Sequence, residues 1–359
     1  MSEPIGTIDA AAAVREGEAL DVAKLDAWLA EVLPELQGPL SVAQFPGGYS
    51  NLTYLLRKGE HELVLRRPPF GARVKSGHDM GREYRVLAGL APVYPPAPRP
   101  LAQCNDAAVI GAPFYVMQRR RGLIVRKQLP EGITPELLGR MCESLVDELV
   151  ALHAVDLDAA GLRDLGHPEG YVRRQVEGWT ARWHKARTDD VPDIEALAAW
   201  LDAHQPGDGD VCLVHNDYKF DNVVLDPDDL THIRAVLDWE MATVGDPWMD
   251  VGTTLGYWAE AGDPELLRNF GITALAGNLT RQQFVDAYAA ASGRDVTHAL
   301  FYLVFGLYKV AVIVQQIYAR YRQGHTQDPR FAGLIHLVRV NGEMMTRAIE
   351  TQRLSGLFG

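Results

Sequence analysis

"LVHNDYKFDNVVLD", residues 213–226, places a dense group of polar side chains between two apolar runs of a 359-residue chain. The polar residues are His215, Asn216, Asp217, Lys219, Asp221 and Asn222. A polar turn between two strands would explain this composition without any chemistry. The alternative is an active-site loop that the flanking strands hold in place.

The spacing inside this loop, and the position of a later aspartate, are specific. Asp217 lies two positions after His215, and Lys219 follows two positions later. Asn222 comes three positions after Lys219. Asp238 stands in "AVLDWE", after a further apolar run and 16 positions beyond Asn222. This layout resembles the catalytic loop of protein kinases, in which a metal-binding aspartate follows a hairpin.

Phosphoryl transfer explains why these residue types would be needed together. A carboxylate orients the acceptor hydroxyl and takes its proton, and oxygen ligands hold magnesium on the phosphates. We expect Asp217 to fill the first role and Asn222 and Asp238 the second. Lys219 would balance charge on the transferring group. We expect His215 to be a buried residue that supports the loop.

The longer run "VHNDYKFDNVVLD…AVLDWEMATVGDPWMDVG" is similar to the aminoglycoside phosphotransferase family. Within that family it resembles the kinase-like domain fused to some acyl-CoA dehydrogenases, and the resemblance covers nearly the whole chain, from about Phe45 onward. It implies an α+β, protein-kinase-like fold of two lobes. Residues 1–118 would form a strand-rich nucleotide-binding lobe with a leading helix, and residues 119–359 a mostly helical lobe with the catalytic loop and acceptor site.

The same resemblance implies ATP and Mg²⁺ as cofactors and a small-molecule hydroxyl as the phosphate acceptor. The dehydrogenase-linked branch suggests a hydroxyacyl-CoA thioester, and the basic segment "QRRRGLIVRK" would then lie near the entrance for CoA. A charged run of this kind is usually a solvated surface. The resemblance also implies that Asp250, in "DPWMDVG", is a structural acid beneath the catalytic loop.

For the nucleotide, the resemblance points to two segments of the N-terminal lobe. "FPGGYSNLTYLL" occupies the place of the nucleotide-covering loop, where Gly47, Gly48 and Ser50 would bring backbone N–H groups near phosphate. The competing interpretation is a plain hairpin turn.

A cation on a strand is the second expected nucleotide contact. Kinases pair a strand lysine with a helix glutamate, and here Arg66 and Glu83 take those places. Arginine keeps the charge but replaces a point charge with a planar fork. Arg67 is a rival for the same role.

Local patterns predict the elements that carry these residues. Helices are expected from Asp21 to near Gly38 and over residues 79–91. The second would have an inward stripe of Met80, Tyr84, Leu87 and Ala91, with Glu83 on the same face. The runs "SVAQF", "TYLLR" and "HELVLR" predict a meander of antiparallel strands. Within the helical lobe, two strands are expected at residues 223–225 and 233–237.

Composition limits the classes of partner. A net charge of −12 argues against nonspecific binding of nucleic acid, which needs a broad basic face. The three cysteines are scattered, so a reducing, cytoplasmic setting is expected. The N-terminus does not have the pattern of a signal peptide. Residues 299–314 are apolar but short for a bilayer span and include Lys309, so we expect a buried helix and no membrane partner.

Two other functions compete with a kinase. The first is a binding or regulatory module that keeps the kinase fold without catalysis, for which Arg66 in place of lysine is the main argument. The second is a metallohydrolase built on His215 and Asp217, which lacks further clustered histidines. Trp179 and Trp183, four positions apart on an expected helix, would either line an acceptor pocket or pack in the core.

Overall fold

The computed structural model describes residues 10–46, 51–70, 79–269, 271–326 and 328–358, and every structural statement below concerns these residues. The strand-rich part comprises α1 (Val22–Val32), β1 (Leu40–Gln44), β2 (Leu52–Lys58), β3 (His61–Arg67), α2 (Met80–Leu90), β4 (Pro100–Cys104), α3 (Ala107–Ile110) and β5 (Phe114–Gln118). The larger part comprises α4 (Pro135–His153), η2 (Arg163–Leu165), α5 (Tyr171–Ala186), α6 (Pro192–Ala203), β6 (Cys212–Val214), η3 (Phe220–Asn222), β7 (Val223–Leu225), β8 (Ile233–Val236), η4 (Trp239–Met241), β9 (Thr243–Gly245), α7 (Pro247–Gly256), α8 (Glu265–Arg268), α9 (Arg281–Ser292), α10 (Ala299–Arg322), η5 (Pro329–Phe331) and α11 (Leu334–Thr351).

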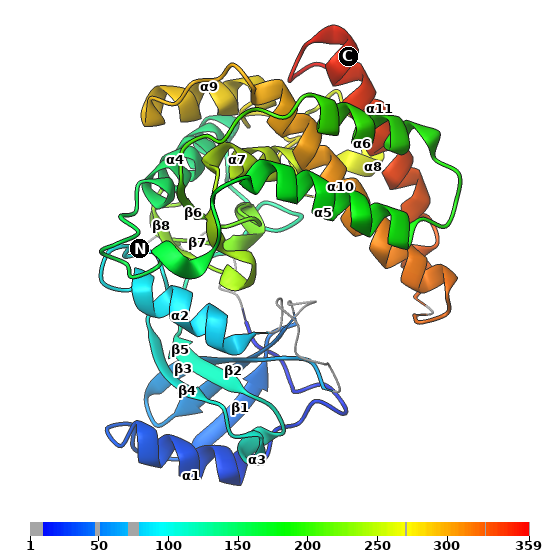
Figure 1. Ribbon diagram of the computed structural model, residues 1–359. Coiled ribbons are helices and arrows are strands. Elements are labelled where there is room, and N and C mark those ends of the chain that lie inside the picture. The colour runs from blue at the N-terminus through cyan, green and yellow to red at the C-terminus, as the bar shows by residue number, and fades with distance from the viewer. Residues whose placement is uncertain (1–9, 47–50, 71–78, 270, 327, 359) are drawn as a thin grey trace.

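One antiparallel sheet organises the first part of the chain. Its strand order is β1-β2-β3-β5-β4, and β2 pairs with β3 along its whole length, from Leu52 opposite Arg67 to Lys58 opposite His61. Figure 1 shows α1 and α2 on opposite faces of this sheet, with α2 on the side of the helical part. The predicted meander and the two-lobed, kinase-like fold class are confirmed.

Side chains of β3 alternate between the two faces of the sheet. Leu63 and Leu65 join the apolar cluster that contains α1, whereas Val64 joins the cluster that contains α2. Arg66 follows Val64 by two positions and therefore points to the side of α2 and the helical lobe. Arg67 follows Leu65 and points the other way.

The predicted inward stripe of α2 is partly wrong. Met80 and Leu87 are buried as expected, but Tyr84 and Ala91 are only half-buried. The observed stripe is Met80, Glu83, Val86, Leu87 and Leu90. Both sets have helical spacing, but the buried face is centred closer to Glu83, Val86 and Leu90 than the predicted one. Glu83, which was predicted on this face, is buried there.

The long helix α10 is the centre of the helical part, where it packs against α5, α7 and α11 (Figure 1). It is long and apolar enough to cross a membrane by length and composition, but 78% of its most apolar window is buried within the fold. The crossing of α7 and α10 is very close. A Cβ atom added at Gly306 would lie 1.7 Å from the carbonyl oxygen of Gly252, so neither position has room for a side chain.

The helical part contains two small antiparallel sheets, where the sequence predicted only one hairpin. The predicted strands are present as β7 and β8, joined by a turn. The additional pair, β6 and β9, brackets the whole segment from the catalytic loop to α7. Each of these strands has three residues, which is too short for a period of two to stand out.

Candidate active site

A left-handed backbone residue, Asn216, shapes the start of the catalytic loop after β6. Its φ of 67° is uncommon for a residue with a side chain, so surrounding contacts must stabilise it. The buried carboxylate of Asp250 accepts from the backbone N–H of His215 at 2.6 Å and of Asn216 at 2.7 Å. Lys309 donates from α10 to the Asn216 carbonyl at 2.9 Å. Asp250 and Lys309 therefore fix the peptide groups before and after Asn216.

Asp250 is the buried acid that the family resemblance implies. Burial alone would raise its pKa, but hydrogen bonds from His153 and from the backbone of His215 outweigh burial and hold the pKa below the ordinary value. His153 lies 3.2 Å from Asp250 through Nε2 and 2.7 Å from the Tyr288 hydroxyl through Nδ1. Burial lowers the pKa of His153, which favours a neutral ring that donates from Nε2.

His215 lies beneath the loop and is fully buried. The backbone N–H of Asp217 donates to its Nδ1 at 3.2 Å, so Nδ1 is the unprotonated nitrogen of the ring. Nε2 then carries the proton and donates to the Leu237 carbonyl at 2.9 Å. One imidazole thus joins the catalytic loop to the segment that leads into Asp238.

The Asp217 carboxylate is held on both sides by its own loop. Lys219 Nζ lies 2.7 Å and 3.0 Å from its two oxygens, and Asn222 Nδ2 donates at 2.8 Å to Oδ2 and to the Asp217 carbonyl. Burial would lower the pKa of Lys219, but Asp217 and Tyr257 raise it above its ordinary value. Lys219 is therefore a protonated partner for a carboxylate whose side chain is 20% exposed.

Asp238 lies beside Asn222 because the β7–β8 hairpin closes there. Val223 pairs with Val236, and the Leu237 N–H donates to the Asn222 carbonyl at 2.7 Å. Asp238 itself has a φ of 69°, so a second left-handed residue turns the chain directly after this bond. The structure thus brings together Asp217, Lys219, Asn222 and Asp238, as the sequence predicted.

Arg66 and Glu83 complete this side of the site. Arg66 Nε lies 3.2 Å from Glu83, and Nη2 lies 2.9 Å from Asp238 and 3.3 Å from Glu240. Burial would lower the pKa of Arg66, but Glu83 and Asp238 raise it well above its ordinary value. Arg67, the rival, is buried on the opposite face of the sheet and donates to the Ile110 carbonyl at 2.8 Å.

Sequence analysis missed Glu240 and Asn51. Glu240 shares Arg66 with Asp238 and accepts from Asn51 Nδ2 at 2.7 Å. The sequence carried one signal for Glu240: it lies two residues after Asp238, so the two carboxylates would flank the same turn. The predicted contacts Gly47, Gly48 and Ser50 lie outside the described residues.

The loop residues without a predicted role prove to be mostly structural. The Tyr218 hydroxyl donates to the Leu145 carbonyl at 2.9 Å, and the Phe220 ring stacks near Trp258. Asp221 is half-buried, and burial raises its pKa although Lys219 and Arg126 oppose this shift. Trp179 and Trp183 are buried, which favours core packing over an acceptor pocket.

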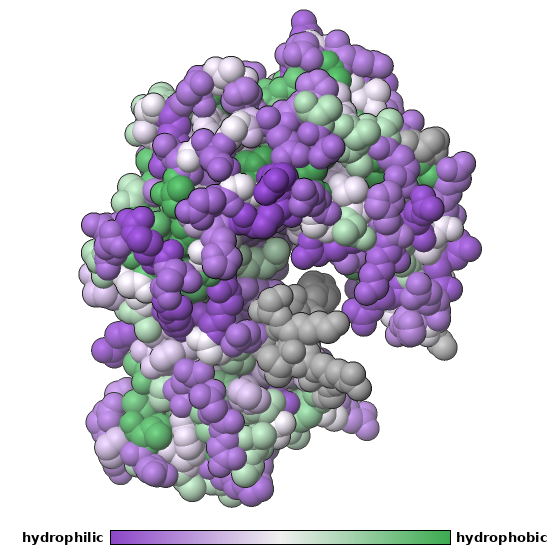
Figure 2. Space-filling view, in the orientation of Figure 1, coloured by the Kyte–Doolittle hydropathy of each residue, from purple (hydrophilic) through white to green (hydrophobic). Residues whose placement is uncertain are grey.

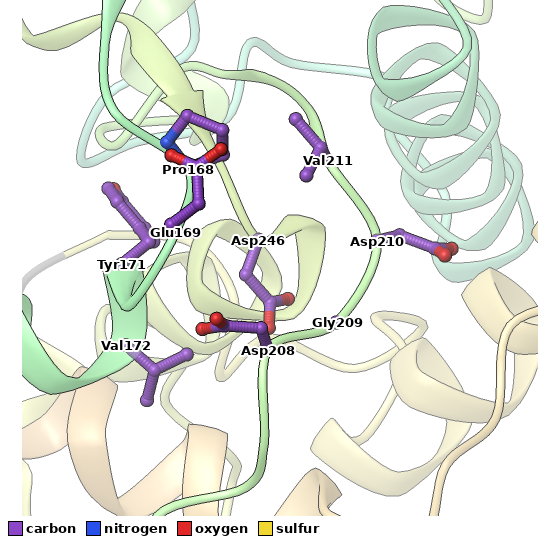
Figure 3. A pocket seen from close by; sticks show the side chains of 9 residues that line it. All are labelled: Pro168, Glu169, Tyr171, Val172, Asp208, Gly209, Asp210, Val211 and Asp246. Carbon is purple, nitrogen blue, oxygen red and sulfur yellow. The ribbon is translucent and has the colours of Figure 1, made fainter.

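The face of the molecule in Figure 2 is hollowed between the strand-rich lobe and the helical lobe, with hydrophilic side chains along much of the helical rim. A separate cavity of about 100 Å³ lies on the Tyr171 side of the loop (Figure 3). Its three aspartates have partners in the protein: Asp246 accepts from the Tyr302 hydroxyl at 2.7 Å, Asp208 from the Gly170 N–H, and Asp210 pairs with Arg294. The lining of this cavity includes none of the predicted catalytic or metal-binding residues.

Comparisons with known proteins identify the family of the chain. The model of the phosphotransferase enzyme family matches residues 41–286. The chain is 34% identical over 316 residues to rat acyl-CoA dehydrogenase family member 11, covering 86% of this chain and 40% of that protein. It is 34% identical over 296 residues to mouse family member 10, covering 81% of this chain and 27% of that protein. The chain thus spans less than half the length of these relatives.

Solved structures show the same fold. A Ralstonia eutropha protein described as a candidate aminoglycoside phosphotransferase superposes with a TM-score of 0.81 at 32% identity, covering 93% of this chain and 99% of that one. The GDP complex of an aminoglycoside 2′-phosphotransferase superposes with a TM-score of 0.58 at 14% identity, covering 90% and 98%, and this likeness concerns the fold alone. By its sequence, its fold and the residues gathered around Asp217, the chain belongs to the phosphotransferase enzyme family.

Proposed function

We propose that the protein transfers the γ-phosphate of ATP to a hydroxyl group of a small molecule in a reaction that depends on Mg²⁺. One observation carries the proposal: Asp217 is held by Lys219 and Asn222 in a loop whose backbone also binds the segment leading to Asp238. A structural turn would not need a carboxylate fixed in this way and still partly exposed.

Asp217 would orient the acceptor hydroxyl and take its proton. Its Oδ2 already accepts from Asn222, so we assign Oδ1, which Lys219 contacts at 2.7 Å, to the incoming hydroxyl. Lys219 stays protonated and offsets negative charge that develops as the phosphoryl group moves. Arg66 would meet the phosphates from the strand-rich lobe, since its side chain points toward Asp238.

The donor set suits Mg²⁺, which prefers hard oxygen ligands. The Asp238 carboxylate and the Asn222 amide oxygen would hold the ion, because the amide nitrogen of Asn222 is engaged with Asp217. Glu240 supplies another carboxylate, which pairs with the same Arg66 guanidinium as Asp238. When bound, the metal neutralises charge on the nucleotide phosphates.

For the acceptor, we propose a hydroxylated acyl chain, carried as a CoA thioester. The support is the similarity to proteins named acyl-CoA dehydrogenase family members over most of this chain. A polycationic aminoglycoside would prefer acidic walls, whereas Asp221 and Asp217 lie near the cations Lys219 and Arg126. Release of ADP or GDP, measured with Mg²⁺ across hydroxyacyl thioesters, aminoglycosides, sugars and amino alcohols, tests acceptor and nucleotide together.

Asp217→Asn tests the catalytic assignment. We expect turnover to fall about 10²–10⁴-fold, because general-base assistance is lost, while nucleotide affinity stays unchanged. Asp286→Asn, on the exposed face of α9, is the matched control and should keep parental turnover. If Asp217→Asn turns over like the parent, another group is the base.

The runner-up function, a silent nucleotide-binding module, makes a different prediction. The parent would then show a thermal shift with nucleotide but no ADP release with any acceptor, and Asp217→Asn would change nothing measurable. Asp238→Ala should weaken Mg²⁺-nucleotide binding in either case, which makes it a check on the metal assignment alone.

A further inference from the structure

A second concave surface lies at the connection between the lobes, around residues 118–121, and its lining does not include Asp217. We call it the arginine pocket; its volume is about 500 Å³, and it is lined by Pro95, Pro96, residues 118–121 and residues 232–234. These segments precede β4, follow β5 and begin β8, so both lobes contribute walls. Among the described lining residues there are four arginines and a histidine but no carboxylate.

Positive charge exceeds negative charge around this pocket. Glu62, beside it, pairs with Arg57 at 3.1 Å and with Arg121 at 2.7 Å, and it also binds Arg119. Burial would raise the pKa of Glu62, but the arginines hold it below its ordinary value, so the carboxylate is charged. Five arginines, Arg57, Arg119, Arg120, Arg121 and Arg234, thus stand against two carboxylates that pair with them, Glu62 and Asp226. In a chain of net charge −12, this is a local reversal of sign.

Arg120 lacks a carboxylate partner among the described residues. Its Nη2 donates to the Pro95 carbonyl at 2.7 Å and, weakly, to the Ala97 carbonyl at 3.4 Å. Its Nε is buried and has no hydrogen-bond acceptor in the described structure. This Nε is closed to solvent, so a ligand would contact Arg120 through the part of its half-buried side chain that lines the pocket.

Arg234 forms the opposite wall. It pairs with Asp226 at 2.9 Å and donates to the Arg121 carbonyl at 3.2 Å, which ties the β7–β8 hairpin to the connection between the lobes. His232 also faces Asp226, at 3.6 Å. These bonds hold the guanidinium groups in place before any ligand arrives, which lowers the entropic cost of binding.

We propose that the arginine pocket binds a small organic phosphate with at least two negative charges, at a site separate from the catalytic centre. Guanidinium forks match phosphate oxygens in geometry and keep their charge at any physiological pH. The volume suits a ligand of nucleotide size rather than a simple ion. The basic area is too compact for a polynucleotide, which needs an extended basic face.

The test is calorimetric titration of the full chain with adenosine 3′,5′-bisphosphate and, separately, with inorganic pyrophosphate, both with EDTA present. We expect the bisphosphate to bind, and Arg120→Gln/Arg234→Gln to weaken it at least tenfold. The control Arg163→Gln/Arg173→Gln removes the same charge from exposed sites of the helical lobe and should bind like the parent. Arg121→Glu, at a side chain that is 62% exposed, reverses charge with little risk to folding and should also abolish binding.

Several results would overturn the proposal. If the parent does not bind the bisphosphate, or if the control variant loses as much affinity, the arginines only stabilise the contact between the lobes. Binding that survives in Arg120→Gln/Arg234→Gln but disappears in Arg66→Gln would place the ligand in the catalytic cleft. If pyrophosphate binds and adenosine 3′,5′-bisphosphate does not, the proposal that the ligand is an organic phosphate is wrong.

Discussion

Replacing Asp250 with asparagine should release the catalytic loop from its support. The carboxylate accepts from two backbone N–H groups, of His215 at 2.6 Å and of Asn216 at 2.7 Å, one on each oxygen. An asparagine has only one carbonyl oxygen, so its NH₂ group must face one of these donors whichever way the amide turns. One charge-assisted hydrogen bond is lost, and a buried donor is left without an acceptor.

The magnitude follows from these two losses. A hydrogen bond to a charged group contributes about 1.5–3 kcal/mol, and an unsatisfied buried donor costs about 1–3 kcal/mol more. We therefore expect Asp250→Asn to lower the free energy of unfolding by about 3–5 kcal/mol at neutral pH, in the range for breaking a buried charged network. Turnover should fall as well, because Asn216 loses part of what holds its left-handed backbone.

Urea unfolding followed by tryptophan fluorescence measures this loss, with an unchanged slope as the sign that the same transition is observed. Asp286→Asn, on the exposed face of α9, is the control and should stay within about 0.5 kcal/mol of the parent. The pKa of Asp250 is below its ordinary value of 3.8 in the folded state, so its contribution is present above pH 3.8 and is lost as the pH falls further. A destabilisation below about 1 kcal/mol at pH 7 would refute the reasoning.

Two further substitutions test the helical lobe. Gly306→Ala places a methyl group 1.7 Å from the Gly252 carbonyl oxygen, so it should force α7 and α10 apart and lower the free energy of unfolding in urea by about 3 kcal/mol. The control Gly324→Ala has no atom within 4 Å but a positive φ, and it should lower the free energy of unfolding by about 1 kcal/mol. Equal losses in the two variants would contradict close packing as the cause. Burial lowers the pKa of Lys309 to about 8, from an ordinary value of 10.5. Between pH 8 and pH 10.5 the unfolded chain therefore binds more protons than the folded chain. Over this range the parent should gain about 3 kcal/mol of stability relative to Lys309→Met. A stability difference that stays flat or falls with pH would contradict a desolvated ammonium group at this position.

Local patterns were sufficient to predict the sheet and the loop, but contacts between distant segments were not predictable in the same way. The spacing from His215 to Asn222 lies within one turn and hairpin, so it could be identified directly. The choice between Arg66 and Arg67 stayed open in the sequence, because Val64 and Leu65 are both apolar, and only the structure shows that they lie on opposite faces of β3.

The remaining parts of the site depend on segments that meet only in three dimensions. Lys309 was noted as a charge within an apolar helix, but its acceptor, the Asn216 carbonyl, is 93 positions away in the chain. The bond between Asn51 and Glu240 spans 189 positions. No period or motif encodes such pairs, since they follow from how the lobes pack together.

Polar contacts cross the cleft between the lobes, and they affect how the cleft can move. Arg66 binds Asp238 and Glu240 across the cleft, and Arg82 on α2 donates to the Leu165 and Ala242 carbonyls at 2.9 Å and 2.8 Å. Separating the lobes to release a product would break these bonds as well as apolar contacts, because one cluster of buried residues includes side chains of both lobes. Ionic strength should therefore affect how fast the cleft opens through the charged pairs, and the dwell time of a bound nucleotide should shorten as salt rises.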